Sequence, residues 1–258
     1  MNEEIGLVLS GGGVRAIAHI GLIKVLLENG IVPTQVSGTS AGALVCALYA
    51  AGYNTDEMIQ FFKQTPILDF SLYALNKPGI LDSGKYEKFF KTFFSENSFE
   101  KLKYPLTTTA TNLLSGRLEY FSKGELIKPL IASCALPPLF SPLKINDKLY
   151  SDGGILNNFP VEPLKKQKIP KIIGSFVNPI TPIKESEINS SLKLVYRVYH
   201  LGLEMNNIKK FKLCNYVFEP KAIDKIGTLE TKGIDTAFEI GYNQAKKEIN
   251  EILISLEK

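Results

Sequence analysis

Residues 36–42, with the sequence VSGTSAG, decide the predicted fold, because they place a serine between two glycines where a strand meets a helix. An apolar stretch with the character of a helix follows at residues 43–51. Gly38, Ser40 and Gly42 have the G-x-S-x-G spacing that holds a nucleophile on a tight strand-to-helix turn. The free N–H groups of the following helix would stabilise an oxyanion beside that serine. The sequence therefore predicts Ser40 as a nucleophile.

A glycine-rich loop earlier in the chain offers a binding site for an anion. It follows the almost wholly apolar run at residues 5–9, which is typical of a buried strand in a parallel sheet. Gly11, Gly12 and Gly13 then lead into a helix, so their backbone N–H groups are exposed at a helix N-terminus. If this strand and the strand before Ser40 are parallel neighbours, the loop lies beside the serine. Its amides are then placed to bind an oxyanion.

The same loop also fits a second interpretation, as a dinucleotide-binding turn. Gly11, Gly13 and Ala16 satisfy the G-x-G-x-x-[GA] fingerprint. That fingerprint requires an acidic residue at the end of the second strand, whereas this strand ends in the Ser40 turn without Asp or Glu. The sequence therefore favours the oxyanion interpretation. Arg15 either holds the loop in shape, meets an anionic group of a substrate, or is a solvated residue of the first helical turn.

An aspartate followed by two glycines is the second candidate for chemistry. A hairpin predicted at residues 143–151 ends in Asp152, Gly153 and Gly154. The two glycines leave the backbone uncrowded, so Asp152 can come within hydrogen-bonding distance of another group. An ordinary turn aspartate has the same local sequence, and the motif alone does not separate the two interpretations.

The number of histidines favours a carboxylate base. A Ser-His-Asp triad requires a histidine, and the chain has two, His19 and His200. Both lie in stretches with the periodicity of packed helices, which indicates structural roles. A serine nucleophile without histidine needs another base, and a carboxylate in direct contact is the simplest. Because aspartate is ionised at neutral pH, the sequence predicts that Asp152 accepts the proton of Ser40.

Composition and charge exclude several classes of protein. The 258 residues are 45% hydrophobic and 22% charged, as expected for one globular domain over residues 1–258. The net charge is only +4 and the basic residues are scattered along the chain. This pattern excludes a nucleic-acid-binding surface but allows transient contact with an anionic membrane surface. The N-terminus lacks the features of a secretory signal, and no apolar stretch reaches the roughly 20 residues of a membrane span. We therefore expect a cytoplasmic protein.

The segments outside the motifs have mainly structural interpretations. Residues 66–82 are apolar without a clear period, and they form either a core-lining loop or a lid over an acyl-chain pocket. Helices within residues 188–258 are expected to cover the sheet. Cys46, Cys134 and Cys214 are widely spaced in apolar contexts, so we expect reduced core residues rather than disulfide partners or metal ligands.

Three ordered motifs together resemble the patatin-like phospholipase family, in particular its bacterial members related to neuropathy target esterase. The motifs are SGGGVR at residues 10–15, GTSAG at 38–42 and DGG at 152–154. Further similar stretches are AIAHIG at residues 16–21, ASCALP at 132–137 and LNNFPV at 156–161. The resemblance covers residues 5–180 of the chain.

This resemblance implies a fold, an activity and a set of site residues. The fold is expected to be a three-layer α/β/α sandwich with a mainly parallel central sheet. The activity is expected to be hydrolysis of phospholipid or lysophospholipid acyl esters through an acyl-enzyme, without a metal or organic cofactor. Ser40 is then the nucleophile, Asp152 the base, and the loop from Gly11 to Gly13 the oxyanion site. Where the family usually has glycine after the loop arginine, this chain has Ala16, which is small enough to preserve activity.

A regulator or adaptor on the same fold is the alternative from a different class of protein. Such a protein would bind a protein partner with weak or no turnover, and the sequence identifies no partner. The intact set of Ser40, Asp152 and the glycine loop argues for the enzyme, because an adaptor does not need all three together. Loss of catalysis without loss of partner binding in Ser40→Ala would separate the two roles.

Overall fold

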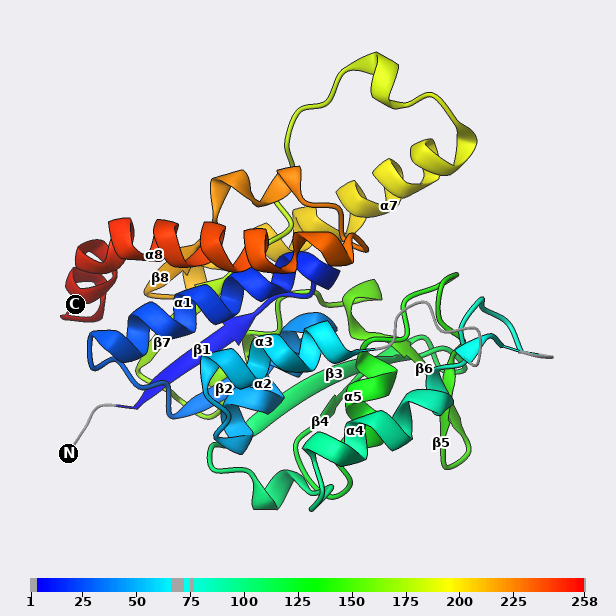
Figure 1. The fold of residues 1–258 in the computed structure, drawn as a ribbon, viewed down its shortest axis with the longest axis horizontal. Helices are drawn as coiled ribbons and strands as arrows, with labels where there is room; N and C mark the ends of the chain where they lie inside the picture. The colour runs from blue at the N-terminus through cyan, green and yellow to red at the C-terminus, as the bar shows by residue number, and fades with distance from the viewer. Residues whose placement is uncertain (1–3, 66–71, 75–76, 258) are drawn as a thin grey trace.

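The chain folds around a central eight-stranded sheet (Figure 1). The computed structural model describes residues 4–65, 72–74 and 77–257, without the side chain of Leu192. The strands are β1 (Ile5–Leu9), β2 (Gln35–Gly38), β3 (Leu106–Asn112), β4 (Arg117–Phe121), β5 (Leu143–Ile145), β6 (Lys148–Asp152), β7 (Lys171–Ser175) and β8 (Tyr216–Phe218). Their order is β5-β6-β3-β2-β1-β7-β8, and β4 also pairs with β3. Strands β3, β2, β1, β7 and β8 are parallel, whereas β4, β5 and β6 add antiparallel pairs.

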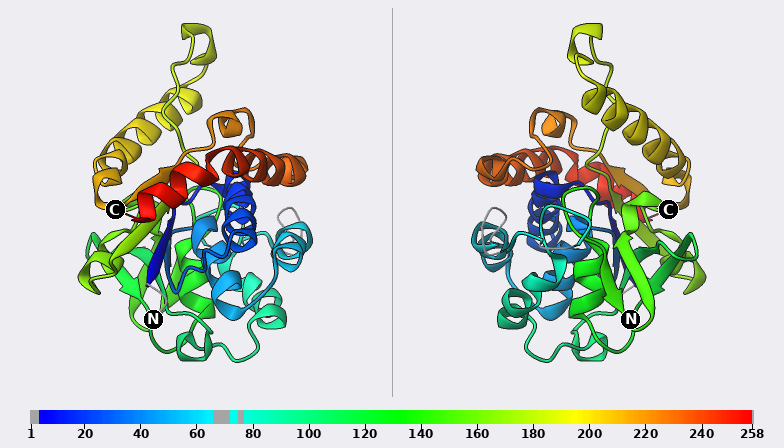
Figure 2. Two further views of the ribbon diagram at one scale, coloured as in Figure 1. Left: turned by 90° about the vertical axis from the view of Figure 1, so that its left-hand side faces the viewer. Right: turned by 90° about the vertical axis from the view of Figure 1, so that its right-hand side faces the viewer.

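Helices lie on both faces of the sheet, which gives three layers (Figures 1 and 2). They are α1 (Ile17–Glu28), α2 (Ala41–Ala51), α3 (Thr55–Gln64), α4 (Glu87–Phe93), α5 (Ile127–Ser133), α6 (Glu162–Lys166), α7 (Ser191–Ile208) and α8 (Ile234–Glu257). The predicted α/β fold class with a mainly parallel central sheet is confirmed.

The two largest hydrophobic cores lie on opposite faces of the sheet. Side chains alternate along a strand, so Leu7 and Leu9 of β1 enter the larger core, while Val8 enters the smaller one. The larger core contains residues of α1, α2 and α8. The smaller core includes Phe159 and Leu164 on the opposite face. Because both faces of β1 are buried, its run of apolar residues is the expected pattern for a central parallel strand.

The last two long helices pack to different extents. Helix α8 lies along α1, and the C-terminal end of α7 contacts the smaller core through Ile208. The N-terminal half of α7 extends beyond the sheet (Figure 1) and leaves Leu194, Val195 and Val198 exposed to 49%, 63% and 61%. No helix within the described ranges has the length and apolar character to cross a bilayer.

Much of the expected loop or lid at residues 66–82 lies outside the described residues, at 66–71 and 75–76. Its described end at Leu81 is buried and forms a bridge with Phe140. Both interpretations of the segment therefore remain predictions.

Helices α1 and α8 touch through their backbones, and we expect this contact to be intolerant of even one methyl group. A Cβ at Gly241 would lie 2.1 Å from the Ala18 carbonyl oxygen, so the helices would have to separate. We expect Gly241→Ala to lower the free energy of unfolding by about 2–3 kcal/mol. Urea unfolding measures this. As a control, Gly202→Ala in α7 meets nothing within 4 Å and should be neutral or stabilising. Equal stability of both variants would contradict the expected crowding.

Candidate active site

Ser40 stands on the turn between β2 and α2 in a conformation that few residues other than glycine adopt. Its φ of 52° and ψ of −133° turn the side chain out of the backbone, and its N–H donates to Ser133 Oγ at 2.9 Å. A Cβ at Gly42 would lie 2.3 Å from the Ser10 carbonyl oxygen, and one at Gly38 would lie 2.8 Å from the Gly42 carbonyl. Close packing of this turn therefore explains both glycines of the motif.

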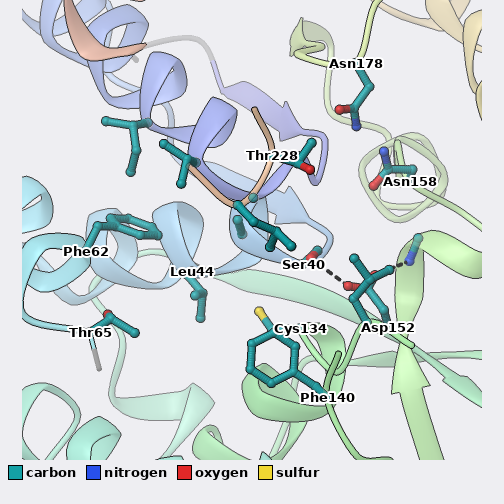
Figure 3. A pocket seen from close by; sticks show the side chains of 18 of the residues that line it. Ser40, Leu44, Phe62, Thr65, Cys134, Phe140, Asp152, Asn158, Asn178 and Thr228 are labelled. Atoms are coloured by element: carbon teal, nitrogen blue, oxygen red, sulfur yellow. Dashed lines mark hydrogen bonds between the residues drawn. The ribbon is translucent and has the colours of Figure 1, made fainter. Parts of the chain in front are cut away.

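The end of β6 brings Asp152 into direct contact with Ser40. Ser40 Oγ donates to Asp152 Oδ2 at 2.7 Å, and the Gly154 N–H donates to Oδ1 at 2.7 Å (Figure 3). Gly153 packs against β3, where a Cβ would lie 2.2 Å from Thr109 Oγ1. The glycines after the aspartate thus allow a tight turn that holds one carboxylate oxygen and leaves the other for the serine.

The carboxylate of Asp152 is a stronger base than an exposed aspartate. It is 2% exposed, and burial raises its pKa to about 6, although the hydrogen bonds from Ser40 and Gly154 act in the opposite direction. At neutral pH the group is therefore still ionised, and a pKa nearer the working pH suits a general base.

This raised pKa leads to an expected pH dependence of any reaction that needs the ionised Asp152. Below the pKa of about 6 the carboxyl is protonated, so kcat/KM for a neutral soluble ester should fall about tenfold per pH unit and be constant above pH 7. Burial raises the pKa of Glu204, which lines the same cavity, to about 7. Because Glu204 could also titrate in this range, the pH dependence of kcat/KM is measured again in Glu204→Gln. The midpoint of the fall in kcat/KM should remain near pH 6 in this variant. A rate independent of pH between 5 and 7 would contradict a role for Asp152 as base.

The glycine loop lies at the same edge of the sheet as the serine turn, because β1 and β2 pair in parallel. The Gly11 N–H already donates to Asn158 Oδ1 at 3.0 Å, and Asn178 Nδ2 donates to the Gly11 carbonyl at 2.7 Å. Among the described residues, the amides of Gly12 and Gly13 have no hydrogen-bond partner. Of the three predicted oxyanion donors, the Gly11 amide is therefore already occupied, and the oxyanion role of Gly12 and Gly13 stays a prediction.

Arg15 braces the glycine loop against the segment that precedes α8. Its Nε donates to the Ile226 carbonyl at 2.6 Å, and its Nη2 donates to the Asp224 carbonyl at 3.2 Å. The Val14 N–H donates to the Thr228 carbonyl in the same segment at 2.9 Å. Of the three interpretations of Arg15, these contacts favour support of the loop.

Neither histidine is bonded to the serine and aspartate. His19 is fully buried, with Nδ1 2.7 Å from Ser175 Oγ and Nε2 2.9 Å from the Ser10 carbonyl oxygen. Burial lowers the pKa of His19 to about 4, so the ring is neutral and its Nε2–H donates to Ser10. His19 thus holds Ser10, the residue just before the glycine loop. His200 lies on the cavity wall, and burial lowers its pKa.

A cavity of about 230 Å³ opens beside Ser40 and Asp152 (Figure 3). Asn158 and Glu204 contribute polar groups to its lining, and Cys134, predicted as a core residue, also lies on the wall. Most of the lining is apolar and includes Val14, Ile17, Leu44, Phe62, Phe90 and Phe140. A mostly apolar cavity with the Ser40–Asp152 pair on its wall suits a ligand with a hydrocarbon chain and a polar reacting group.

Several polar residues of the site escaped prediction from the sequence. Ser133 and Asn158 lie in the ASCALP and LNNFPV stretches, and the similarity of these stretches to the family could have identified both residues as candidates. Asn178 and Glu204 lie outside every motif. Their places at the site depend on contacts between elements that are distant in the chain.

The fold and the site together define a class of α/β protein: a serine on a strand-to-helix turn, a buried carboxylate partner, and an apolar cavity beside them. The chain belongs to the patatin-like phospholipase family, whose profile matches residues 7–165. The resemblance drawn from the three motifs is thereby confirmed.

Sequence relatives agree with this assignment, and a solved structure shares the fold. An uncharacterized NTE family protein of Mycobacterium tuberculosis (strain ATCC 25618 / H37Rv) is 34% identical over 166 residues, which cover 63% of this chain and 46% of the relative. Lysophospholipase nte1 of Emericella nidulans is 29% identical over 287 residues, covering 97% of this chain and 18% of the relative. The crystal structure of VipD from Legionella pneumophila has a TM-score of 0.55 at 17% identity, covering 96% of this chain and 67% of VipD. The chain thus spans less than half the length of these two sequence relatives.

Proposed function

We propose that this chain is a serine acyl hydrolase that cleaves acyl esters of phospholipids or lysophospholipids. The observation that carries this proposal is the 2.7 Å hydrogen bond from Ser40 Oγ to the buried Asp152, beside an apolar cavity. Membership of the patatin-like phospholipase family supports a lipid substrate. A relative named lysophospholipase supports the same class.

The proposed reaction has two stages, and Asp152 moves a proton in each. Asp152 Oδ2 accepts the proton of Ser40 Oγ while Oγ bonds to the ester carbonyl carbon, and the N–H groups of Gly12 and Gly13 bind the resulting oxyanion. The carbon–oxygen bond to the alcohol then breaks, and the alcohol leaves with the proton from Asp152. In the second stage water attacks the acyl carbonyl carbon while Asp152 accepts a proton from the water. The bond from that carbon to Ser40 Oγ then breaks as Oγ takes the proton back from Asp152, which releases the fatty acid and restores both residues.

Turnover of lipid esters by the purified chain tests this function. Lysophosphatidylcholine, a diacyl phospholipid and a short-chain p-nitrophenyl ester serve as substrates, with free fatty acid or p-nitrophenol as the readout. Release of fatty acid at many turnovers per chain is the expected result. Complete inactivity of the folded chain toward all three would overturn the proposal and favour the adaptor alternative, which requires no turnover.

The exposed half of α7 is the part of the chain that we propose meets the lipid surface. Tyr196 and Tyr199 line the cavity and are 53% and 39% exposed, and Val195 and Val198 on the same half of the helix are exposed further. An apolar surface that continues into the cavity would let an acyl chain pass from lipid to Ser40 without crossing water.

We expect the double variant Val195→Asp/Val198→Asp to lower hydrolysis of phosphatidylcholine vesicles about tenfold, because two charges oppose insertion into lipid. Its kcat/KM for the soluble p-nitrophenyl ester should be unchanged. Leu114→Asp is the control, since Leu114 is 69% exposed but lies in the turn between β3 and β4. An equal loss on both substrates would contradict the lipid-contact role. A dimer of the wild-type chain that dissociates in the variant would instead assign this face to a second copy.

A further inference from the structure

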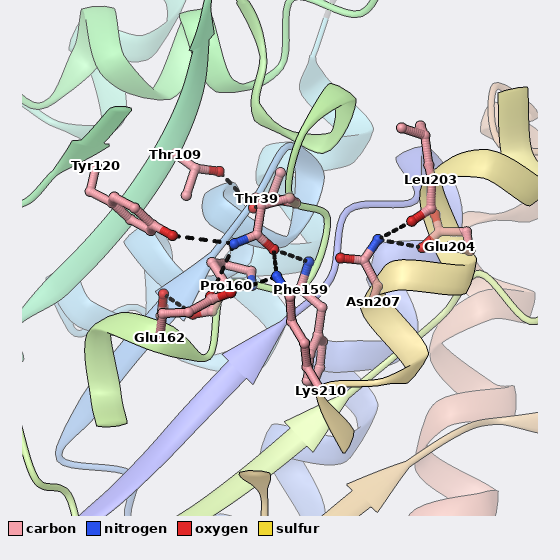
Figure 4. A network of polar contacts seen from close by, with 12 residues as sticks. Thr39, Thr109, Tyr120, Phe159, Pro160, Glu162, Leu203, Glu204, Asn207 and Lys210 are labelled. Carbon is pink, nitrogen blue, oxygen red and sulfur yellow. Dashed lines mark hydrogen bonds and ion pairs between the residues drawn. The ribbon is translucent and has the colours of Figure 1, made fainter. Parts of the chain in front are cut away.

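Glu204 is a buried carboxylate that the proposed reaction does not use. It lies on α7, lines the cavity and is 3% exposed. Its Oε1 accepts a hydrogen bond from Asn158 Nδ2 at 2.8 Å. Its Oε2 accepts one from Asn207 Nδ2 at 3.1 Å (Figure 4). Burying a carboxylate costs free energy unless the carboxylate is hydrogen-bonded. A carboxylate at this position is therefore expected to have a role other than filling space.

The bond from Asn158 to Glu204 determines which way the Asn158 amide faces. An asparagine side chain has a donor NH₂ at one end and an acceptor oxygen at the other. Because Glu204 Oε1 accepts, it holds the NH₂ end of Asn158, and the oxygen end accepts the Gly11 N–H at 3.0 Å. Without that acceptor, the amide can turn and present NH₂ to the Gly11 N–H, which breaks the bond.

Gly11 connects this pair to the reacting groups. A Cβ on Gly11 would lie 2.8 Å from Ser40 Cβ and 2.6 Å from Asn158 Oδ1, so the peptide is enclosed between the two residues. The amides of Gly12 and Gly13 follow it directly, and a small rotation of the Gly11 peptide changes where they point.

Lys210, just after the end of α7 that carries Glu204, forms an ion pair with α6 and a hydrogen bond with the residue before Asn158. Lys210 Nζ lies 2.6 Å from Glu162 Oε1 and donates to Asn157 Oδ1 at 2.7 Å (Figure 4). Asn157 is the neighbour of Asn158 in the chain. The helix end and the loop are therefore joined at two adjacent residues, which suits a fixed support.

We propose that Glu204 is a positioning residue: by orienting the Asn158 amide it holds the Gly11 peptide, and thereby aims the Gly12 and Gly13 amides at the oxyanion. The catalytic part of this statement rests on the proposed acyl hydrolysis. The structural part, that Glu204 holds Gly11 through Asn158, does not depend on turnover.

Two substitutions of similar volume separate positioning from packing. Glu204→Met removes both acceptors, and we expect kcat for the soluble ester to fall about 10- to 100-fold with KM within about twofold, because misplaced amides weaken only the transition state. Glu204→Gln keeps one acceptor oxygen and should lose less than about fivefold. Met205→Gln, an exposed neighbour on α7, should behave as wild type. Wild-type kcat in Glu204→Met would overturn the positioning role.

A double-substitution cycle tests whether Glu204 acts through Asn158. In an Asn158→Ala background, Glu204→Met should change kcat less than about twofold, because the connecting amide is already absent. If the losses of kcat in the two single variants multiply in the double variant, Glu204 acts independently of Asn158, and the proposal would be overturned.

Amide hydrogen exchange gives a readout that is independent of activity. Peptides covering residues 8–16 should exchange faster in Glu204→Met than in wild type, because the Gly11 N–H loses its acceptor. Unchanged exchange there would overturn the structural part even in an active enzyme. The wild-type chain could hydrolyse no ester while exchange at residues 8–16 still increases in Glu204→Met. That result would overturn the proposed function but support the structural role of Glu204 in holding Gly11.

Discussion

Replacing Ser40 with alanine is expected to reduce hydrolysis of every ester substrate to background, at least about 10⁴-fold. The hydroxyl is the only group of Ser40 that can form the acyl-enzyme, so no residual route remains through this residue. The fold should be unaffected, because alanine at a φ of 52° is no more strained than serine. The backbone N–H that donates to Ser133 Oγ is also retained.

Intact-mass spectrometry after treatment with a fluorophosphonate measures the same serine directly. In wild type, Ser40 Oγ should bond to phosphorus as fluoride leaves, which adds one label per chain. Ser40→Ala should remain unlabelled, whereas Ser115→Ala, a change in the exposed turn between β3 and β4, should be labelled like wild type. A label that persists in Ser40→Ala would place the nucleophile elsewhere.

Replacing Asp152 with asparagine is expected to lower kcat about 10³-fold and to slow fluorophosphonate labelling to a similar extent. Asparagine can still accept the Gly154 N–H through one oxygen, so the local turn is kept. Its NH₂ group then faces Ser40 Oγ and cannot accept a proton. Asp147→Asn, the same chemical change in the exposed turn of the β5–β6 hairpin, should have no effect.

The stability of Asp152→Asn separates a chemical role from a folding defect. The folded-state pKa of about 6 lies above the ordinary value of 3.8, so the fold gains stability from the protonated carboxyl at low pH and loses it as pH rises through 6. At pH 8 the ionised form costs about 3 kcal/mol, and the neutral asparagine avoids much of this cost. Urea unfolding should therefore find the variant at least as stable as wild type at pH 8. An inactive variant that is much less stable would leave Asp152 with a structural role.

The candidate serine and aspartate were predictable because their local requirements are written in adjacent residues. The glycines around Ser40 and after Asp152 let neighbouring backbone segments pack closely against the two turns. These glycines stand within a few positions of the residues they serve, so they can be recognised in the sequence. The apolar run of β1 is typical of a buried parallel strand, and the supposition that β1 and β2 are parallel neighbours was sufficient to place the glycine loop near the serine.

The sequence by itself thus determined the fold class, the family and the two residues proposed to react. Only the tertiary structure decided the 2.7 Å contact geometry of Ser40 Oγ with Asp152 Oδ2, the occupation of the Gly11 amide by Asn158, and the support of Asn158 by Glu204 of α7. The physical reason is that a backbone turn depends on the residues next to it in the chain. A buried polar group, in contrast, must find a hydrogen-bond partner wherever the fold places it, so the packing of distant elements determines that partner.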